Sequence, residues 1–200
     1  MKVFSWPALL LLSLFWFQAS SQILVGPTAG ANYSWTSFAN KDLKNSYKMI
    51  PTFGFHVGGH LAFKVRNRFF LHTSLLYAIK GREIEGKTDV LLKTSERYSY
   101  IDMPLSYTVD FKGKLGSNKE FKYFLGIGPD ISYWLGAKGT LYNSDLEENN
   151  LGEISYKAVF DKDPENQHQD EMNVEEPNRF QFGLNFVAGM VLEPAPRQRT

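Results

Sequence analysis

Histidine, lysine and aspartate residues recur at positions of one parity, inside stretches where apolar and polar residues alternate. His56 and His60 are four positions apart, a spacing that on a helix would suggest a metal-binding pair. On a strand this spacing separates the two rings by about 13 Å at ~3.3 Å per residue, too far to share an ion unless another strand intervenes. We therefore predict a polar interior lining and neither a metal nor a cofactor; the lining residues are His56, His60, Lys64, His72, Lys80, Asp102, Asp110, Lys122 and Asp130.

The charged members of this set are expected to pair across strands and to plug a narrow interior, because an unpaired buried charge is costly. Three serines lie on the same parity as the predicted lining residues and are the candidates for acyl transfer or phospholipid hydrolysis; they are Ser74, Ser106 and Ser132. Such a site needs a Ser or His beside a base near the lipid face, and the chain has no Gly-x-Ser-x-Gly elbow or comparable spacing. The sequence therefore predicts a protein that is not an enzyme.

Alternating stretches of ten or more residues are the elements that would position these side chains. In residues 121–136, one parity is nearly all aliphatic or aromatic, while the other is mostly Gly, Ser and charged residues. A strand reads this way when one face meets lipid and the other lines a lumen. Its length suits a membrane, which needs roughly 9–11 tilted residues. Six such strands are predicted, at residues 23–35, 50–64, 69–80, 98–111, 121–136 and 180–192.

The connections between these strands alternate in length. Those at residues 36–49, 81–97 and 137–179 are long, and the two others are short. Outer-membrane barrels have short periplasmic turns and longer outside loops, so we expect the N-terminus to be periplasmic. The strands of a soluble sandwich or lipocalin-like barrel would also alternate apolar and polar residues. Such a fold would turn its apolar side inward and carry fewer aromatic residues opposite a Gly/Ser face.

The first residues read as an export signal. Lys2 precedes an apolar stretch at residues 8–17, and Ala19-Ser20-Ser21 forms a small-residue cleavage site. We predict a signal peptide at residues 1–21 and one barrel domain at residues 22–200; a retained anchor is the alternative, although the apolar run is short of ~20 residues. Cleavage would leave 21 basic and 21 acidic residues, because the chain has 22 and 21 and Lys2 is removed. That balance argues against a nucleic-acid partner, and the absence of Cys excludes disulfides and a lipid-anchored N-terminus.

Six segments, in order, resemble the PorT-like outer-membrane β-barrel family, a group of small "porin family" barrels of Bacteroidetes-type bacteria. The Ile-Asp-Met-Pro-Leu segment is the most distinctive, because a mid-strand proline is otherwise disfavoured. The resemblance implies an integral outer-membrane barrel, tied in some members to protein secretion and gliding, with no catalytic residues to transfer. The matching segments are Gly26-Pro-Thr-Ala-Gly-Ala-Asn-Tyr33, Phe53-Gly-Phe-His-Val-Gly-Gly59, Leu75-Leu-Tyr-Ala-Ile-Lys-Gly81, Tyr100-Ile-Asp-Met-Pro-Leu105, Phe124-Leu-Gly-Ile-Gly-Pro129 and Phe182-Gly-Leu-Asn-Phe186.

The predicted fold is all-β, an up-and-down antiparallel transmembrane β-barrel with six strands visible and eight expected in the intact protein. An open edge in lipid leaves unpaired backbone groups that cost several kcal/mol each. We favour a missing pair of C-terminal strands; closure with a partner or a nonstandard pairing is the alternative. An eight-stranded barrel is just wide enough for side chains to fill it, so no channel of porin width is expected.

The connection at residues 138–178 is acidic, with eleven carboxylates and three lysines. A solvated, mobile outer loop is the simplest interpretation. The sharper one is that it docks an envelope or secretion-system protein, or bridges to lipid phosphates through divalent cations, although it lacks the Gly and spacing of a calcium loop. The chain is thus predicted to be a structural or interaction component, with a barrel lipase, an acyltransferase or a small-solute porin as alternatives. The candidate contact residues are Asp145, Glu147, Glu148, Asp161, Asp163, Glu165, Asp170 and Glu171.

Overall fold

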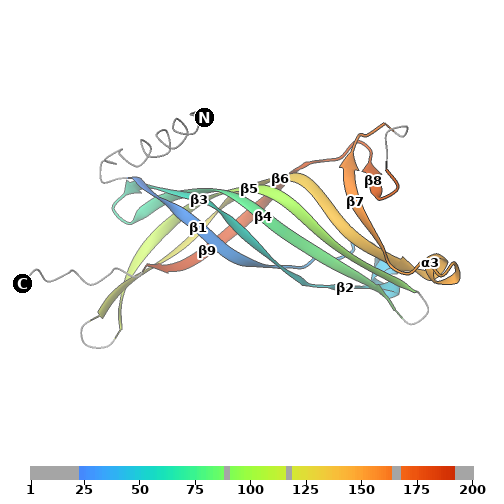
Figure 1. Ribbon diagram of the computed structural model, residues 1–200. Helices are drawn as coiled ribbons and strands as arrows, with labels where there is room; N and C mark the ends of the chain where they lie inside the picture. The colour runs from blue at the N-terminus through green and yellow to red at the C-terminus, as the bar shows by residue number, and fades with distance from the viewer. Residues whose placement is uncertain (1–22, 88–90, 116–118, 164–167, 192–200) are drawn as a thin grey trace, which may run out of the picture.

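Six long strands form one continuous antiparallel sheet in the computed structural model, which describes residues 23–87, 91–115, 119–163 and 168–191 (Figure 1). Each long strand pairs with the next one along the chain, so the sheet is an up-and-down meander. The predicted fold class is confirmed. In order across the sheet, the strands are β1 (Ile23–Ser34), β3 (Thr52–Arg66), β4 (Phe69–Gly86), β5 (Leu92–Leu115), β6 (Lys119–Asn143) and β9 (Phe180–Val191).

The alternation of apolar and polar residues along each strand explains why the two faces of this sheet differ in chemistry. Large apolar side chains on the convex face are solvent-exposed, for example Phe182 at 79 % and Phe186 at 77 %. The concave face buries small and polar side chains, including Thr108 at 0 % and Ala78 at 1 % exposure. This is the reverse of a soluble sheet, which buries its apolar face. The face chemistry therefore agrees with lipid outside and a lumen inside. We call the space on the concave face the lumen.

Glycines allow the sheet to curl tightly around the lumen. A Cβ added at Gly128 would lie 1.8 Å from the carbonyl oxygen of Leu105, and one at Gly58 would lie 2.0 Å from that of Leu75. Neighbouring backbone thus approaches where any other side chain would stand. Among the described residues the sheet is open, because β1 pairs only with β3, and β9 only with β6.

Two of the predicted loops are wrong, because strands continue through much of them. β4 runs to Gly86 and β5 begins at Leu92, so the predicted 81–97 loop is mostly a hairpin. β6 continues to Asn143, and the predicted 137–179 loop also contains α3 (Ser144–Glu148), β7 (Ile154–Phe160) and β8 (Glu171–Val174). The extensions carry polar residues on both faces, as the Arg82–Glu96 and Glu85–Lys93 cross-strand pairs show. A strand wetted on both sides has no apolar face and therefore lacks the alternating signature used to find it.

The predicted loop at residues 36–49 is also partly structured. It contains α2 (Lys41–Ser46), whose N-terminus is capped by the Asn40 side chain, and β2 (Tyr47–Ile50), which pairs with the end of β4. Pro51 separates β2 from β3, as expected for a residue that cannot donate a backbone hydrogen bond. None of the described helices is long and apolar enough to cross a membrane. The predicted signal peptide lies outside the described residues.

A bulge in β6 corrects the predicted parity of its last residues. Tyr100 lies opposite Trp134 and Ser99 opposite Gly136, which leaves Leu135 as the extra residue. Uninterrupted alternation along residues 121–136 would put Gly136 on the inward face. The bulge shifts the alternation of inward and outward side chains by one residue, so this prediction for Gly136 is wrong. Nothing lies within 4 Å of a Cβ built on Gly136. Ala137 takes the inward position and is buried. Bulges commonly sit at the rims of barrels, where they redirect side chains.

Candidate functional site

The lumen opens at two mouths, which the chain builds differently. We call the first the turn mouth: it lies where the short connections β3–β4 and β5–β6 are, together with the start of β1 and the end of β9. The second, the extended mouth, lies at the opposite end, where β4, β5 and β6 continue and where α3, β7 and β8 are attached (Figure 1). A pocket lies at each mouth.

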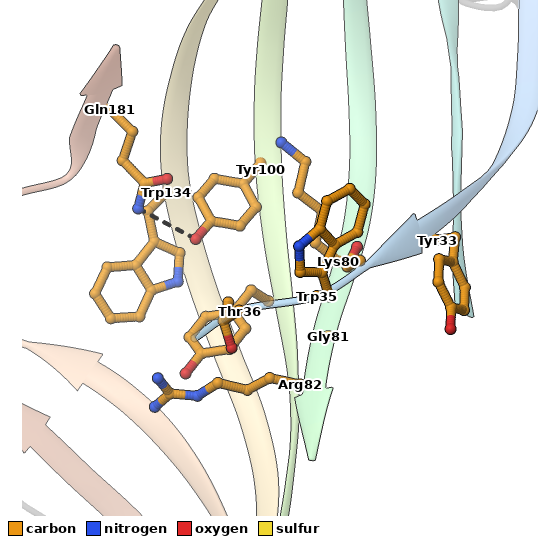
Figure 2. Close-up of a pocket in the computed structure, with 11 residues that line it drawn as sticks. Tyr33, Trp35, Thr36, Lys80, Gly81, Arg82, Tyr100, Trp134 and Gln181 are labelled. Atoms are coloured by element: carbon orange, nitrogen blue, oxygen red, sulfur yellow. Dashed lines mark hydrogen bonds between the residues drawn. The ribbon is translucent and has the colours of Figure 1, made fainter. Parts of the chain in front are cut away.

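The extended mouth holds a pocket of about 520 Å³ with aromatic and cationic side chains around it (Figure 2). Trp134 donates its indole N–H to the carbonyl oxygen of Gly136 at 2.9 Å. Gln181 donates to the Tyr100 hydroxyl at 3.3 Å, which links β9 to β5 across β6. The Lys80 ammonium lies 4.9 Å from the centre of the Tyr100 ring. The lining residues are Tyr33, Ser34, Trp35, Thr36, Lys80, Gly81, Arg82, Tyr98, Tyr100, Trp134 and Gln181.

Every cation that lines this pocket is matched to a carboxylate. Lys80 Nζ lies 2.8 Å from Asp102 Oδ2, and the Arg82 guanidinium donates to Glu96. Of these two pairs, Lys80–Asp102 joins two of the charged residues that were predicted to pair across strands. Asp130 also lies on the inward parity and interacts electrostatically with Asp102 and Lys80.

Glu96 is the centre of a hydrogen-bond network just beyond the membrane-spanning parts of the strands. It accepts hydrogen bonds from Arg82 and Tyr98, and from Tyr156 at 2.6 Å. Burial alone would raise the pKa of Glu96, but the hydrogen bonds from Arg82, Tyr156 and Tyr98 outweigh it and hold the pKa below its usual value. Burial and the same carboxylate raise the pKa of Tyr156. The network joins β4, β5 and β7 through one ionised carboxylate.

Histidines and a serine meet in the middle of the lumen. His60 Nε2 lies 3.0 Å from His72 Nδ1, and His60 Nδ1 lies 2.9 Å from Ser74 Oγ. His72 in turn stacks on Phe124, with 5.7 Å between ring centres. His56 has a different partner, the Asn32 side chain at 2.6 Å, so His56 and His60 do not act as a pair. Within the described residues no group of three or more His, Cys, Asp or Glu side chains could hold a metal.

The remaining predicted lining residues lie at the turn mouth. Lys64, Asp110 and Lys122 border a cavity of about 470 Å³ there. All nine predicted lining residues thus fall on inward-facing positions of the sheet, divided among the two mouths and the middle of the lumen. Sequence reasoning missed Arg82, Glu96 and Tyr156, which it assigned to loops. It did place Trp134 and Gln181 on the inward parity, but no signal marked them as neighbours.

The predicted contact residues of the acidic connection are spread along a folded excursion. Asp145, Glu147 and Glu148 lie in α3, whereas Asp161 and Asp163 follow β7. Asp170 directly precedes β8, and Glu171, the first residue of β8, pairs with Lys162. Asp161 accepts a hydrogen bond from the backbone N–H of Glu176 at 2.9 Å. Glu165 lies outside the described residues. The expectation of an unstructured loop is therefore wrong for most of this segment.

Comparison with protein-family models matches residues 17–194 to an outer membrane protein beta-barrel domain. The match covers every described strand of the sheet, from the start of β1 to the end of β9. No curated protein matches the chain, and no solved structure matches it.

Proposed function

The chain belongs to this family of outer-membrane β-barrel domains, and from that premise we propose that it is a structural or interaction component of the bacterial outer membrane. Its barrel is an anchor with a narrow lumen, and its extended mouth presents a folded surface to an envelope or secretion-system protein. Short turns on one side and long connections on the other orient the extended mouth outward. A place in the PorT-like group, with a role accessory to secretion or gliding, is the finer form of this proposal.

The observation that carries the proposal is the filled concave face. Asp102, Ser106, Thr108 and Ser132 are all buried, and Ser106 donates to Asn185 at 2.5 Å, from β5 to β9 across β6. Side chains that occupy a lumen in this way leave little room for solutes, which argues against a small-solute porin. We expect planar-bilayer recordings of the full chain to show no large, stable conductance.

The extended mouth is the surface best suited to a partner. β7 pairs with β6 and is followed by β8, which runs parallel to β7 and has no further strand beside it within the described residues. Because this surface stands on strands that continue from the barrel wall, it can be held rigidly. Its acidic character favours a partner with a basic face.

Replacing residues 144–178 with a flexible linker tests this proposal. The linker should have about 14 residues, because it must return along β6 from Asn143 to Arg179 at roughly 3.3 Å per residue. We expect a barrel that still shows heat-modifiable gel mobility but loses its crosslinked partner in pull-downs from cells. A second variant replaces only Asp145, Glu147 and Glu148 by their amides and keeps β7 and β8; we expect it to weaken capture of the partner, because these carboxylates are among the candidate contacts, while the folded surface is retained. Partner retention by the linker variant would refute the proposal.

A hydrolase or acyltransferase is the second candidate, because one observation favours it. The hydroxyl of Ser74 lies within hydrogen-bond reach of His60, which is the contact that activates a serine nucleophile. Against it, this pair lies in the lumen and not at the lipid face. Phospholipid turnover by the purified barrel that disappears in Ser74→Ala but persists in Ser106→Ala would establish this activity in place of the first proposal.

A further inference from the structure

Three cations lie side by side on the wall of the extended mouth, and we call them the basic row. Arg97 on β5 is the direct cross-strand partner of Lys138 on β6, and Lys138 is in turn the partner of Lys157 on β7. All three residues are exposed. Like charges directly opposite each other destabilise a strand pair, so the stability of the sheet does not explain two such contacts in succession.

The basic row points outward, away from the lumen. The next residues along the three strands, Tyr98, Ala137 and Ala158, are also cross-strand partners of one another. Ala137 and Ala158 are buried, and Tyr98 belongs to the inward-facing network around Glu96. Because successive residues of a strand point to opposite faces, the basic row lies on the face that continues from the lipid-facing side of the barrel.

The depth of the basic row matches that of lipid headgroups. Tyr133 on β6 contacts Phe180 on β9, with 4.9 Å between ring centres, and outward aromatic residues of this kind mark the edge of the apolar band. Tyr133 is the partner of Ile101, and Arg97 lies four residues farther along β5. At about 3.4 Å per residue and a tilt of ~40°, this distance is about 10 Å along the membrane normal. Long cationic side chains can bend back across it to the headgroup layer, which is about 5–8 Å thick.

A cleft of about 510 Å³ lies along the basic row. All three cations line it, together with the small hydroxyl side chains of Ser95, Thr140 and Ser155 and one carboxylate, Asp170. Lysine, arginine and hydroxyl groups are donors that phosphate oxygens accept hydrogen bonds from. The lining therefore suits a phosphate group.

The carboxylates near the cleft do not pair with these cations. Within the described residues no carboxylate forms an ion pair with Arg97, Lys138 or Lys157. Glu171 lies opposite Lys157 in the register of β7 and β8, but its carboxylate pairs with Lys162 and accepts a hydrogen bond from a backbone N–H at 3.0 Å. This differs from the lumen side of the same mouth, where each cation of the pocket is matched to a carboxylate.

Gly81 on β4 helps to hold one end of the basic row in place. It is the cross-strand partner of Arg97, and a Cβ added to it would lie 3.3 Å from Arg97 Cδ. The guanidinium of Arg97 donates a hydrogen bond to the carbonyl oxygen of Phe53. Because a guanidinium has five N–H donors, others remain for a ligand.

We propose that the basic row binds the phosphate group of an anionic lipid in the leaflet around the extended mouth. The row combines exposed cations with a position at headgroup depth, directly beyond a wall that faces acyl chains, and this combination fits a lipid better than a soluble phosphate ester. Basic clusters at a membrane surface attract anionic lipids. The inference extends the membrane anchorage of the barrel and does not rest on the partner proposed above.

Titration of the full chain with phosphatidic acid, in a nonionic detergent and followed by native mass spectrometry, tests the proposal. The test variant is Lys138→Gln/Lys157→Gln. The control is Lys41→Gln/Lys48→Gln, which removes the same charge from exposed positions of α2 and β2 at the same end of the barrel. We expect the test variant to bind the first phosphatidic acid about tenfold more weakly or worse, and the control to bind like the wild type.

Lysine acetylation of the wild-type protein in vesicles gives a second readout that needs no variant. Vesicles of phosphatidylcholine with phosphatidic acid should protect Lys138 and Lys157 from acetylation, compared with vesicles of phosphatidylcholine alone. Lys41 and Lys48 should react equally in both. Heat-modifiable gel mobility confirms that each variant is folded.

Three outcomes would overturn the proposal. The first is that the wild type binds phosphatidic acid no more tightly than phosphatidylcholine. The second is that the two double variants bind phosphatidic acid equally well. The third is that glycerol 3-phosphate protects the same lysines at the concentration at which phosphatidic acid does, which would assign the cleft to a soluble phosphate ester. Partner capture is scored separately, because these variants keep α3, β7 and β8.

Discussion

The two mouths of the lumen use the same residue types in opposite ways. At the extended mouth Lys80 lies against Asp102 and Arg82 against Glu96, so the lining balances its charges internally. At the turn mouth four cations and one carboxylate border the cavity, and Lys112 lies opposite Lys122 in the register of β5 and β6. Removal of one member of a buried ion pair leaves an uncompensated charge and is destabilising, whereas like charges that lie close together repel each other. The internal pairing at the extended mouth gives its charged residues a structural role.

Replacing Glu96 by Gln should produce the largest effect, because it leaves Arg82 without a counter-charge and weakens two tyrosine hydrogen bonds. Breaking a fully buried ion pair costs about 3–5 kcal/mol. The Arg82 side chain is 36 % exposed, so solvent screens it and we expect a loss of about 2 kcal/mol. Urea unfolding of the barrel in vesicles, followed by tryptophan fluorescence, measures it. An unchanged unfolding midpoint would show that the network does not support the extended mouth.

Acid should loosen the extended mouth. The pKa of Glu96 is lower in the folded protein than in the unfolded chain, so its stabilisation is fully present above its usual pKa. That stabilisation is lost as the pH falls below this value and through the lower folded-state pKa. Hydrogen exchange, corrected for intrinsic rates, should therefore show the β4–β5 hairpin opening as the pH falls below the usual range of a glutamate carboxyl. The hairpin of Glu96→Gln should already be open at pH 7 and show less change on acidification.

Replacing Lys112 by Ala should give the smallest effect, and of the opposite sign. Removal of one of two facing lysines relieves a repulsion of at most about 0.2–1 kcal/mol, so the barrel should become slightly more stable. The same urea unfolding assay, in a buffer without phosphate, measures this gain. Destabilisation would show that Lys112 has a structural role.

Much of the membrane-spanning part was predictable, because a strand that crosses lipid needs apolar residues on its lipid face and small or polar residues on its lumen face. Alternation located all six long strands, and it placed His60, Lys80 and Asp102 on the inward face. The extensions of β4, β5 and β6 were missed for the same reason: outside the hydrocarbon layer both faces are wet, and no alternation is required. The Leu135 bulge was missed because a single extra residue leaves the apolar pattern on either side intact.

The sequence by itself determined which residues face the lumen, because parity along a strand depends only on local backbone geometry. Only the tertiary structure decided which of them meet. Whether Lys112 faces Lys122, whether His60 reaches His72, and whether Glu96 collects Arg82, Tyr98 and Tyr156 all depend on register between strands. Register is set by turns, bulges and the curl of the whole sheet, so the charge balance of each mouth appears only once the strands are paired.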